Sequence, residues 1–356
     1  MRIGILGFPR SGKTTLFNVL ARAHAPTGTF ASAAGGIHVG TVLVPDPRLE
    51  ALRDLFEPKK YTPARVEYVD LAGPPSGEDA AAATLLPQQI TTADLLLVVV
   101  RAFEDPAVHH PRGSVDPIRD ATAFGEELLL KDMAVLEGRL DRVRKAKRVG
   151  QKGVEAELAL LERCLASLES GKPLREVGFD EEEEKMLRGF GLLTGRPMLV
   201  AFNVGEDRAK GAGLAASWGD RPGTAAVEIC GKVEMEIADL SEKEASEYME
   251  LLGIRESGLT RVIRLSYDLL GVLSFFTVGK DEVRAWTVPV GTRAVRAAGA
   301  IHSDLERGFI RAEVVPGSDL LAAGGLAEAK SRNLMRVEGK DYVVRDGDVL
   351  NIRFSV

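Results

Sequence analysis

Short apolar runs of strand length alternate with helical segments through much of the chain. The runs that predict strands are 3–6, 41–44, 65–70, 95–100 and 197–202. The run 95–100 is apolar throughout, as expected for a parallel strand that is buried on both faces. Strands that alternate with helices predict an α/β, doubly wound sheet, with ligands bound at the carboxyl ends of its strands.

A different periodicity occupies residues 121–189. Apolar residues recur there with +4, +3 spacing in two stripes: Leu129, Met133, Leu136, Leu140 and Val143, then Val154, Leu158, Leu161, Leu165 and Leu168. Residues 149–153, which include two glycines, separate the stripes. This pattern predicts an antiparallel helical hairpin inserted in the α/β domain.

The C-terminal part of the chain returns to short strands. The runs 275–278, 283–288, 309–314, 341–344 and 349–354 predict strands around a helical patch. This arrangement predicts a small α+β domain of β-grasp type. We therefore expect an α/β domain from 1–120 and 190–271, the hairpin at 121–189 and a third domain at 272–356. Residues 25–40, rich in Ala, Gly, Thr and Ser, predict a mobile loop, and a helix is predicted to run from Pro45 through Leu55.

Composition narrows the classes of protein to consider. The 356 residues are 45% hydrophobic and carry a net charge of −6, so no overall positive charge favours nucleic acid or sequence-specific DNA binding. The two cysteines, Cys164 and Cys230, predict neither a disulfide framework nor a metal site. A strand is predicted to begin at Arg2, and no run approaches membrane-span length. We therefore expect a cytoplasmic protein without a signal peptide.

The clearest chemical motif lies between the first strand and the first helix. Residues 7–15 read Gly-Phe-Pro-Arg-Ser-Gly-Lys-Thr-Thr, which fits the phosphate-loop pattern G-x-x-x-x-G-K-[ST]. Glycines in such a loop let backbone N–H groups surround a phosphate, and the helix N-terminus adds its dipole. Lys13 is expected to reach the β- and γ-phosphates, and the Thr14 hydroxyl to hold Mg²⁺. The residues expected to bind nucleotide here are Gly7, Pro9, Arg10, Ser11, Gly12, Lys13, Thr14 and Thr15.

A second nucleotide motif ends the strand 65–70. Asp70 is followed by Leu-Ala-Gly73, a D-x-x-G sequence at the expected distance from a phosphate loop. Asp70 is predicted to hold Mg²⁺ through a water, and the Gly73 amide to sense a γ-phosphate. These two motifs predict a P-loop NTPase.

Basic residues gather at the predicted tip of the hairpin. They are Arg142, Arg144, Lys145, Lys147, Arg148 and Lys152. A projecting basic tip suits contact with ribosomal or other RNA, while the alternative is an ordinary solvated helix face.

Taken together, these segments resemble the YchF family, the Obg-like ATPases of the P-loop GTPase class. The resemblance covers essentially the whole chain and is most specific in the C-terminal part, which resembles a TGS domain. Its segments are 275–277, 282–286, 298–304, 307–314 and 339–344, with 44–49 and 103–106 nearer the N-terminus. Our first hypothesis is a Mg²⁺-dependent ATPase of slow turnover that associates with the ribosome or RNA, through the hairpin tip and the TGS domain.

The resemblance also implies which base is bound. Most GTPases carry N-K-x-D, whose Asp reads guanine, whereas residues 203–206 here read Asn-Val-Gly-Glu. This tetrad is similar to the N-x-x-E of the family, which prefers ATP over GTP. Asn203, Val204 and Glu206 are therefore expected at the base, unless the tetrad is a plain loop. Cys230 is expected on the last loop beside the base, as a packed small residue rather than a reactive thiol.

The catalytic residue follows from the resemblance alone. Ras-like enzymes place a Gln after D-x-x-G to orient the attacking water, but Pro74 occupies this position. The family is thought to use a His on a mobile loop, which aligns with His110. A His can orient or polarise a water near neutral pH, so we expect His110 and Lys13 to be catalytic. The alternative is that His110 is a solvent-exposed loop residue.

The chain departs from the family at three places, and we therefore interpret it as a divergent paralogue. The phosphate loop has Arg10 and Ser11 where the family usually has Asn and Val. Ala34 aligns with the Thr that normally serves Mg²⁺, and residues 74–78 replace a Gly- and Lys-rich stretch. A nucleotide-binding scaffold with little hydrolysis is therefore an alternative to an ATPase, and a conventional GTPase is a third.

Overall fold

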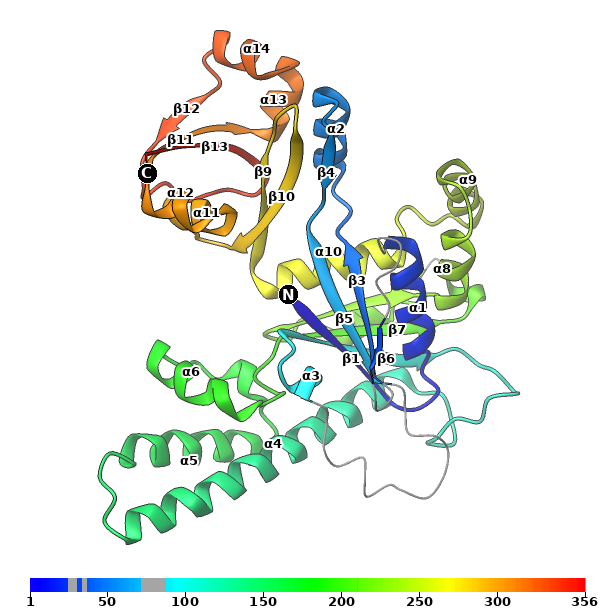
Figure 1. Cartoon of the computed structure of the whole chain (residues 1–356). Helices are drawn as coiled ribbons and strands as arrows, with labels where there is room; N and C mark the ends of the chain where they lie inside the picture. Colours follow the sequence, from blue (N-terminus) through cyan, green and yellow to red (C-terminus); the bar gives the residue numbers. More distant parts are fainter. Residues whose placement is uncertain (25–30, 34–36, 72–87, 210, 356) are drawn as a thin grey trace. The chain divides into compact units, whose positions relative to one another are not determined.

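The structure is a computed structural model that describes residues 1–24, 31–33, 37–71, 88–209 and 211–355. The chain forms two compact units (Figure 1). The first comprises residues 1–42 and 67–269, and the second comprises residues 43–66 and 270–356.

A seven-stranded sheet forms the centre of the first unit. Its strand order is β2-β3-β5-β1-β6-β7-β8. The strands are β1 Arg2–Leu6, β2 Ala31–Ala33, β3 Ile37–Leu43, β5 Arg65–Leu71, β6 Leu95–Ala102, β7 Met198–Val204 and β8 Thr224–Ile229. β5, β1, β6, β7 and β8 run parallel, while β2 pairs antiparallel with β3 at one edge. This confirms the predicted α/β P-loop fold, and it brings the carboxyl ends of the parallel strands to one edge of the sheet.

The central strands are apolar because helices cover the sheet. Every residue of β6 and β7 is buried. The helices of the first unit outside the hairpin are α1 Lys13–His24, α3 Gln88–Thr91, α6 Glu181–Leu187, α7 Leu214–Trp218, α8 Gly231–Ala238, α9 Glu242–Leu252 and α10 Gly258–Leu270. Phe202 of β7 meets Trp218 edge to face, with ring centroids 6.2 Å apart. The buried strands thus give the ends that carry the site a rigid support.

The predicted helical hairpin is present, formed by α4 Pro117–Arg148 and α5 Glu155–Glu169. Leu136 and Leu140 of α4 pack with Leu161 and Leu168 of α5 in one buried cluster. α4 begins at Pro117 because Asp116 caps it, accepting the N–H of Arg119. None of the described helices has the length and apolar character needed to cross a bilayer.

A six-stranded sheet of order β12-β11-β13-β9-β10-β4 forms the second unit. Its strands are β4 Lys60–Thr62, β9 Val272–Thr277, β10 Glu282–Pro289, β11 Phe309–Pro316, β12 Arg336–Glu338 and β13 Asp348–Phe354. Its helices are α2 Pro47–Phe56, α11 Ala294–Ile301, α12 Ser303–Arg307, α13 Gly317–Ala323 and α14 Leu326–Ser331. Phe275 and Leu350 lie in its core, which confirms a separate α+β C-terminal domain.

Segment 43–66 belongs to this second unit, although it was expected in the nucleotide domain. β4 pairs in parallel with β10, and α2 packs on β10 and α13. The Arg48 guanidinium bonds Asp46 and, at 2.6 Å, the Asp346 carboxylate, and lies 5.4 Å from the Phe276 ring centroid. The segment therefore supplies an edge strand and a helix to the C-terminal sheet.

Two local predictions were wrong. Residues 31–33 and 37–40 form β2 and the start of β3 instead of lying in an irregular loop. Residues 341–344 form no strand: Val343 makes one isolated bridge with Arg293, and the Tyr342 hydroxyl bonds the Asp348 carboxylate 2.7 Å away. Gly73, Pro74 and Ala34, on which the γ-phosphate predictions depend, lie outside the described residues.

Candidate functional site

The phosphate loop joins β1 to α1, and two of its positions require glycine. Gly7 and Gly12 have φ of +141° and +95°, in the region that disfavours side chains. A Cβ would lie 2.2 Å from the Val99 carbonyl oxygen at Gly7, and 2.3 Å from Asn203 Nδ2 at Gly12. The Gly12 carbonyl accepts the Leu16 N–H at 2.9 Å and so begins α1. The loop is thus a backbone cradle at a helix N-terminus, as phosphate binding requires.

Lys13 lies inside this cradle. Its Nζ donates to the carbonyl oxygens of Gly7 and Phe8, at 3.0 and 2.9 Å. Burial lowers the pKa of the ammonium, and the nearby Asp70 carboxylate partly opposes that shift. A phosphate oxygen would compete for the same donor, and its charge would favour the protonated lysine.

Thr14 and Asp70 form the pair expected to serve Mg²⁺. The Thr14 hydroxyl donates to Asp70 Oδ2 at 3.1 Å. Asp70 is fully buried, and its Oδ1 has no hydrogen-bond partner among the described residues. Burial raises the pKa of this carboxyl, while Thr14 and Lys13 lower it. A buried oxygen without a donor, beside a hydroxyl and a phosphate cradle, fits a hydrated Mg²⁺.

The remaining magnesium ligands would come from phosphate and water. Within the described ranges, no group of three or more His, Cys, Asp or Glu side chains could hold a metal. The imidazole Nδ1 of His38 in β3 lies 3.9 Å from Asp70 Oδ2. A site of one carboxylate, one hydroxyl and a nucleotide suits Mg²⁺, which keeps several waters.

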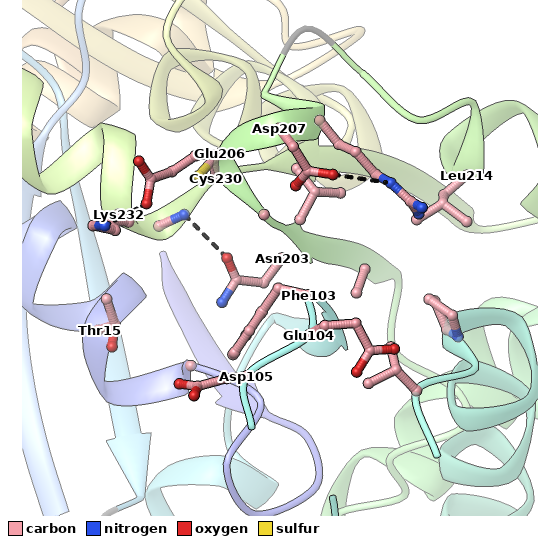
Figure 2. A pocket seen from close by; sticks show the side chains of 18 of the residues that line it. Thr15, Phe103, Glu104, Asp105, Asn203, Glu206, Asp207, Leu214, Cys230 and Lys232 are labelled. Carbon is pink, nitrogen blue, oxygen red and sulfur yellow. Dashed lines mark hydrogen bonds and ion pairs between the residues drawn. The ribbon is translucent and has the colours of Figure 1, made fainter. Parts of the chain in front are cut away.

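Asn203 ties three loops together. Its Nδ2 donates to the Ser11 carbonyl of the phosphate loop at 3.0 Å, and its Oδ1 accepts the Gly231 N–H at 3.0 Å. Figure 2 shows Asn203 between α1, which carries Thr15, and the turn at Cys230. Both amide atoms are therefore used to shape the site.

A pocket of about 1080 Å³ opens beside this asparagine (Figure 2). Residues 102–106 form one wall, 203–208 a second and 230–232 a third, while Gly12 and Thr15 connect it to the phosphate loop. Glu206 forms an ion pair with Lys232. Cys230 is buried, and burial raises the pKa of its thiol, which fits a packing role better than a reactive one. Position and size make this pocket a candidate nucleotide-base site.

The loop 103–116 carries His110 and is built on a buried arginine. Arg101 donates to the carbonyl oxygens of Phe103 at 3.1 Å and Val108 at 2.8 Å, with only 4% of its surface exposed. Its guanidinium also lies 4.7 Å from the Phe103 ring centroid. Arg101 thus fixes both the wall of the pocket and the chain segment that leads to His110.

His110 is held by two partners. Only 7% of its surface is exposed, so it is not the solvent-exposed residue considered as an alternative. Its Nε2 lies 3.0 Å from Asp120 Oδ2, and its Nδ1 accepts the Arg112 N–H at 3.1 Å. Arg119 bonds the same Asp120 carboxylate at 2.9 Å. In this arrangement both ring nitrogens of His110 are engaged by protein groups.

The structure brings most of the predicted site together. Thr14 bonds Asp70, and Lys13 lies close enough to affect the Asp70 carboxylate electrostatically. Asn203 donates to the Ser11 carbonyl of the same phosphate loop. Val204, Glu206 and Cys230 line the neighbouring pocket. Gly73 lies outside the described residues.

Three contributors were missed by the sequence analysis: Arg101, Asp120 and Lys232. A charged residue that ends the apolar run of β6 was the only sequence signal for Arg101. Asp120 and Lys232 gave no signal, because each acts through a partner distant in the sequence.

Two family models match parts of the chain. Residues 2–136 match the family model MMR_HSR1, described as "50S ribosome-binding GTPase". Residues 272–355 match the model YchF-GTPase_C, described as "Protein of unknown function (DUF933)". The two matches cover the segments that carry the phosphate cradle and the C-terminal sheet.

Full-length relatives are also found. The chain is 41% identical to a "Ribosome-binding ATPase YchF" of Bacillus subtilis, covering 99% of each protein. It is 35% identical to "Obg-like ATPase 1" of Caenorhabditis elegans, covering 100% of this chain and 92% of that one. A solved structure, the Schizosaccharomyces pombe YchF GTPase, aligns with a TM-score of 0.83 at 30% identity, over 99% of this chain and 97% of that one.

Proposed function

The chain belongs to the YchF family, and from this premise we propose that it is a slow, Mg²⁺-dependent ATPase that binds the ribosome. The products would be ADP and phosphate, and the location cytoplasmic. The single observation that carries the proposal is the Thr14–Asp70 pair. A buried carboxylate with an unpartnered oxygen at the mouth of a phosphate cradle is costly unless a cation complex uses it.

Different residues of the site would bind the phosphates, hold the cation and orient the water. The backbone N–H groups of the loop and Lys13 hold the β- and γ-phosphates, while Thr14 and Asp70 hold the cation. Mg²⁺, when bound, neutralises phosphate charge. Water attacks the γ-phosphorus and gives up a proton to a γ-phosphoryl oxygen, the bond to the bridging oxygen breaks, and that oxygen leaves with ADP. His110 would orient the water once released from Asp120.

Base choice is proposed from the chemistry of Glu206. Guanine recognition needs a carboxylate that accepts from the N1 and N2 donors, whereas Glu206 already pairs with Lys232. The pair places a lysine at the pocket, and an adenine ring offers acceptors to such a donor. We therefore propose that ATP binds in preference to GTP.

Slow turnover is proposed from the state of His110. With Nε2 at Asp120 and Nδ1 at the Arg112 amide, the ring must break at least one contact before it can hold a water. The same observation favours the second candidate function, a nucleotide-binding scaffold with little hydrolysis.

The proposed ribosome contact is the tip of the hairpin. The exposed cations there include Lys145, Lys147, Arg148 and Lys152, and among the described residues none of these four has a carboxylate partner. Arg144 by contrast pairs with Glu162 at 2.9 Å. Four uncompensated cations on a projecting turn suit a phosphate backbone.

Phosphate release from ATP by the wild type and by His110→Ala tests the function. We expect slow release that needs Mg²⁺ and falls about 100-fold in the variant, the range typical of a lost general acid–base or water-orienting group. Tight ATP binding without release would leave the scaffold. Release at an unchanged rate in His110→Ala would remove this histidine from the mechanism.

A further inference from the structure

Arg10 has an unusual backbone conformation for its place in the chain. Among the described residues, only Arg10, Glu57 and Asn333 are non-glycine residues with positive φ. Glu57 and Asn333 follow the ends of α2 and α14, where helices commonly turn into this conformation. Arg10, with φ of +62°, lies inside the phosphate loop, where a glycine would adopt the conformation without strain. Strain kept at such a position points to a function for the side chain.

The Arg10 side chain is exposed and lies against the histidine loop. Its Nη1 donates to the His109 carbonyl oxygen at 3.0 Å, and among the described residues no carboxylate pairs with it. A guanidinium has five N–H donors, so most remain available for an anion. Its charge is therefore not neutralised by any described protein group.

The other cations of this region are already committed. Lys13 donates to two loop carbonyls, and Arg101 holds the loop 103–108. Arg119 bonds the Asp120 carboxylate, and the Arg112 guanidinium lies 5.4 Å from the Phe8 ring centroid. Arg10 is the described arginine of the site that combines a place in the phosphate loop with uncompensated charge.

The proposed reaction needs such a charge. In phosphoryl transfer, negative charge builds on the γ-phosphoryl oxygens and on the leaving oxygen, and a well-placed arginine stabilises it. The sequence has Pro74 in place of the water-orienting Gln, and both nitrogens of His110 are occupied. Because of these features, we expect the site to lower the barrier mainly by electrostatic stabilisation of the negative charge in the transition state.

We propose that Arg10 is an intrinsic arginine finger: a catalytic residue whose guanidinium moves from the His109 carbonyl to the phosphates in the transition state. The inference rests on the proposed function and adds a residue to it. Arg10 remains protonated throughout. The water oxygen bonds the γ-phosphorus and its proton passes to a γ-phosphoryl oxygen, while the bridging bond breaks and its electron pair leaves on the β-phosphate of ADP. Movement of Arg10 also removes one tether of the loop that holds His110.

The test compares Arg10→Gly, Arg10→Gln and Arg10→Lys in the full chain. Glycine removes the side chain and suits the positive φ, so the variant should keep its melting temperature. Gln keeps a donor for the His109 carbonyl without the charge. Asn333→Gly is the matched control, because it relieves the same strain in the other unit and should leave hydrolysis unchanged.

We expect all three variants to bind ATP and ADP within about threefold of the wild type. Single-turnover hydrolysis should fall about 1000-fold in the Gly and Gln variants, the lower end of the effect of arginine fingers elsewhere. Arg10→Lys should recover only part of the lost hydrolysis rate, because an ammonium lacks the planar, forked N–H donors of a guanidinium. Guanidinium ion at tens of millimolar should partly restore Arg10→Gly.

A second readout does not depend on turnover. ADP with Mg²⁺ and aluminium fluoride imitates the transition state, and we expect the wild type to bind it tightly and Arg10→Gly not to. Wild-type rates in Arg10→Gln would overturn the proposal, because holding His109 would then suffice. Equal fluoride-complex binding by wild type and Arg10→Gly, or by neither, would also overturn it. If the wild type hydrolyses no ATP, the proposed function fails and the catalytic role of Arg10 fails with it, whereas wild-type hydrolysis that Arg10→Gln leaves unchanged overturns the inference alone.

Discussion

At the residue scale, Asp70 joins function to stability. Its carboxylate is buried beside Thr14 with one oxygen unpartnered among the described residues. Since burial raises its pKa in the folded state, folding binds a proton between the unfolded and folded pKa values. The contribution of Asp70 to stability is therefore most favourable below its unfolded pKa and declines as pH rises through the folded value.

Asp70→Asn should thus stabilise the protein without ligand at pH 7, by about 1 kcal/mol, while impairing Mg²⁺-ATP binding. Urea unfolding between pH 4 and 7 would measure the difference, which should grow as pH rises. With saturating Mg²⁺-ATP the order should reverse, because only the wild type gains full ligand stabilisation. Asp54→Asn, an exposed carboxylate, is the control. A variant less stable than the wild type at pH 7 would contradict this account.

The sequence predicted individual residues best where the motif is contiguous. Lys13, Thr14 and Asp70 meet because the ends of β1 and β5 are neighbours in a parallel sheet. The roles of Arg101 and Asp120 were not predictable, since they depend on how a loop folds back on β6 and α4. Nor could the sequence pattern predict that protein groups contact both ring nitrogens of His110.

At the element scale, hydrophobic periodicity correctly predicted the elements whose apolar residues recur at a regular spacing. The stripes of α4 and α5 placed the hairpin, and its turn follows at 149–154. Short strands such as β4 and β12 were missed, because three residues carry no period. The strand expected at 341–344 failed because tertiary contacts of Tyr342 and Val343 override local β-propensity.

The hairpin tip should bind the ribosome through charge. Replacing Lys145, Lys147, Arg148 and Lys152 by Gln should raise the Kd for ribosomes at least about tenfold at low salt and less at high salt. ATP hydrolysis should stay within about twofold. Co-sedimentation with ribosomes measures the first and phosphate release the second. Lys172, Lys185, Arg188 and Arg255, which are also exposed and have no carboxylate partner among the described residues, provide the matched control set of four. Equal binding by both sets would rule out the tip.

At the scale of the whole molecule, the chain is not divided at a single point. Residues 43–66 leave β3, join the C-terminal unit, and return to β5, the strand that ends at Asp70. No composition shift marks this excursion, so sequence analysis placed it in the nucleotide domain. The consequence is that the C-terminal unit is completed by a segment from the middle of the nucleotide-binding sequence.

The C-terminal unit should therefore require this segment. A fragment of residues 270–356 would expose the edge of β10 and the surface under Leu49 and Leu52, both fully buried in the chain. We expect it to aggregate or unfold without cooperativity, and to regain a cooperative transition when 43–66 is fused to it. Thermal unfolding followed by circular dichroism measures both. Equal midpoints for the two fragments would show that the segment adds nothing.

We propose that the assembled site binds and cleaves ATP with Mg²⁺. Single-turnover cleavage of γ-labelled ATP and GTP, each with Mg²⁺ or with excess EDTA, measures this activity. We expect cleavage of ATP with Mg²⁺, slower cleavage of GTP at equal concentration, and none with EDTA. Faster cleavage of GTP, or no cleavage of bound ATP, would show that the proposed activity is wrong.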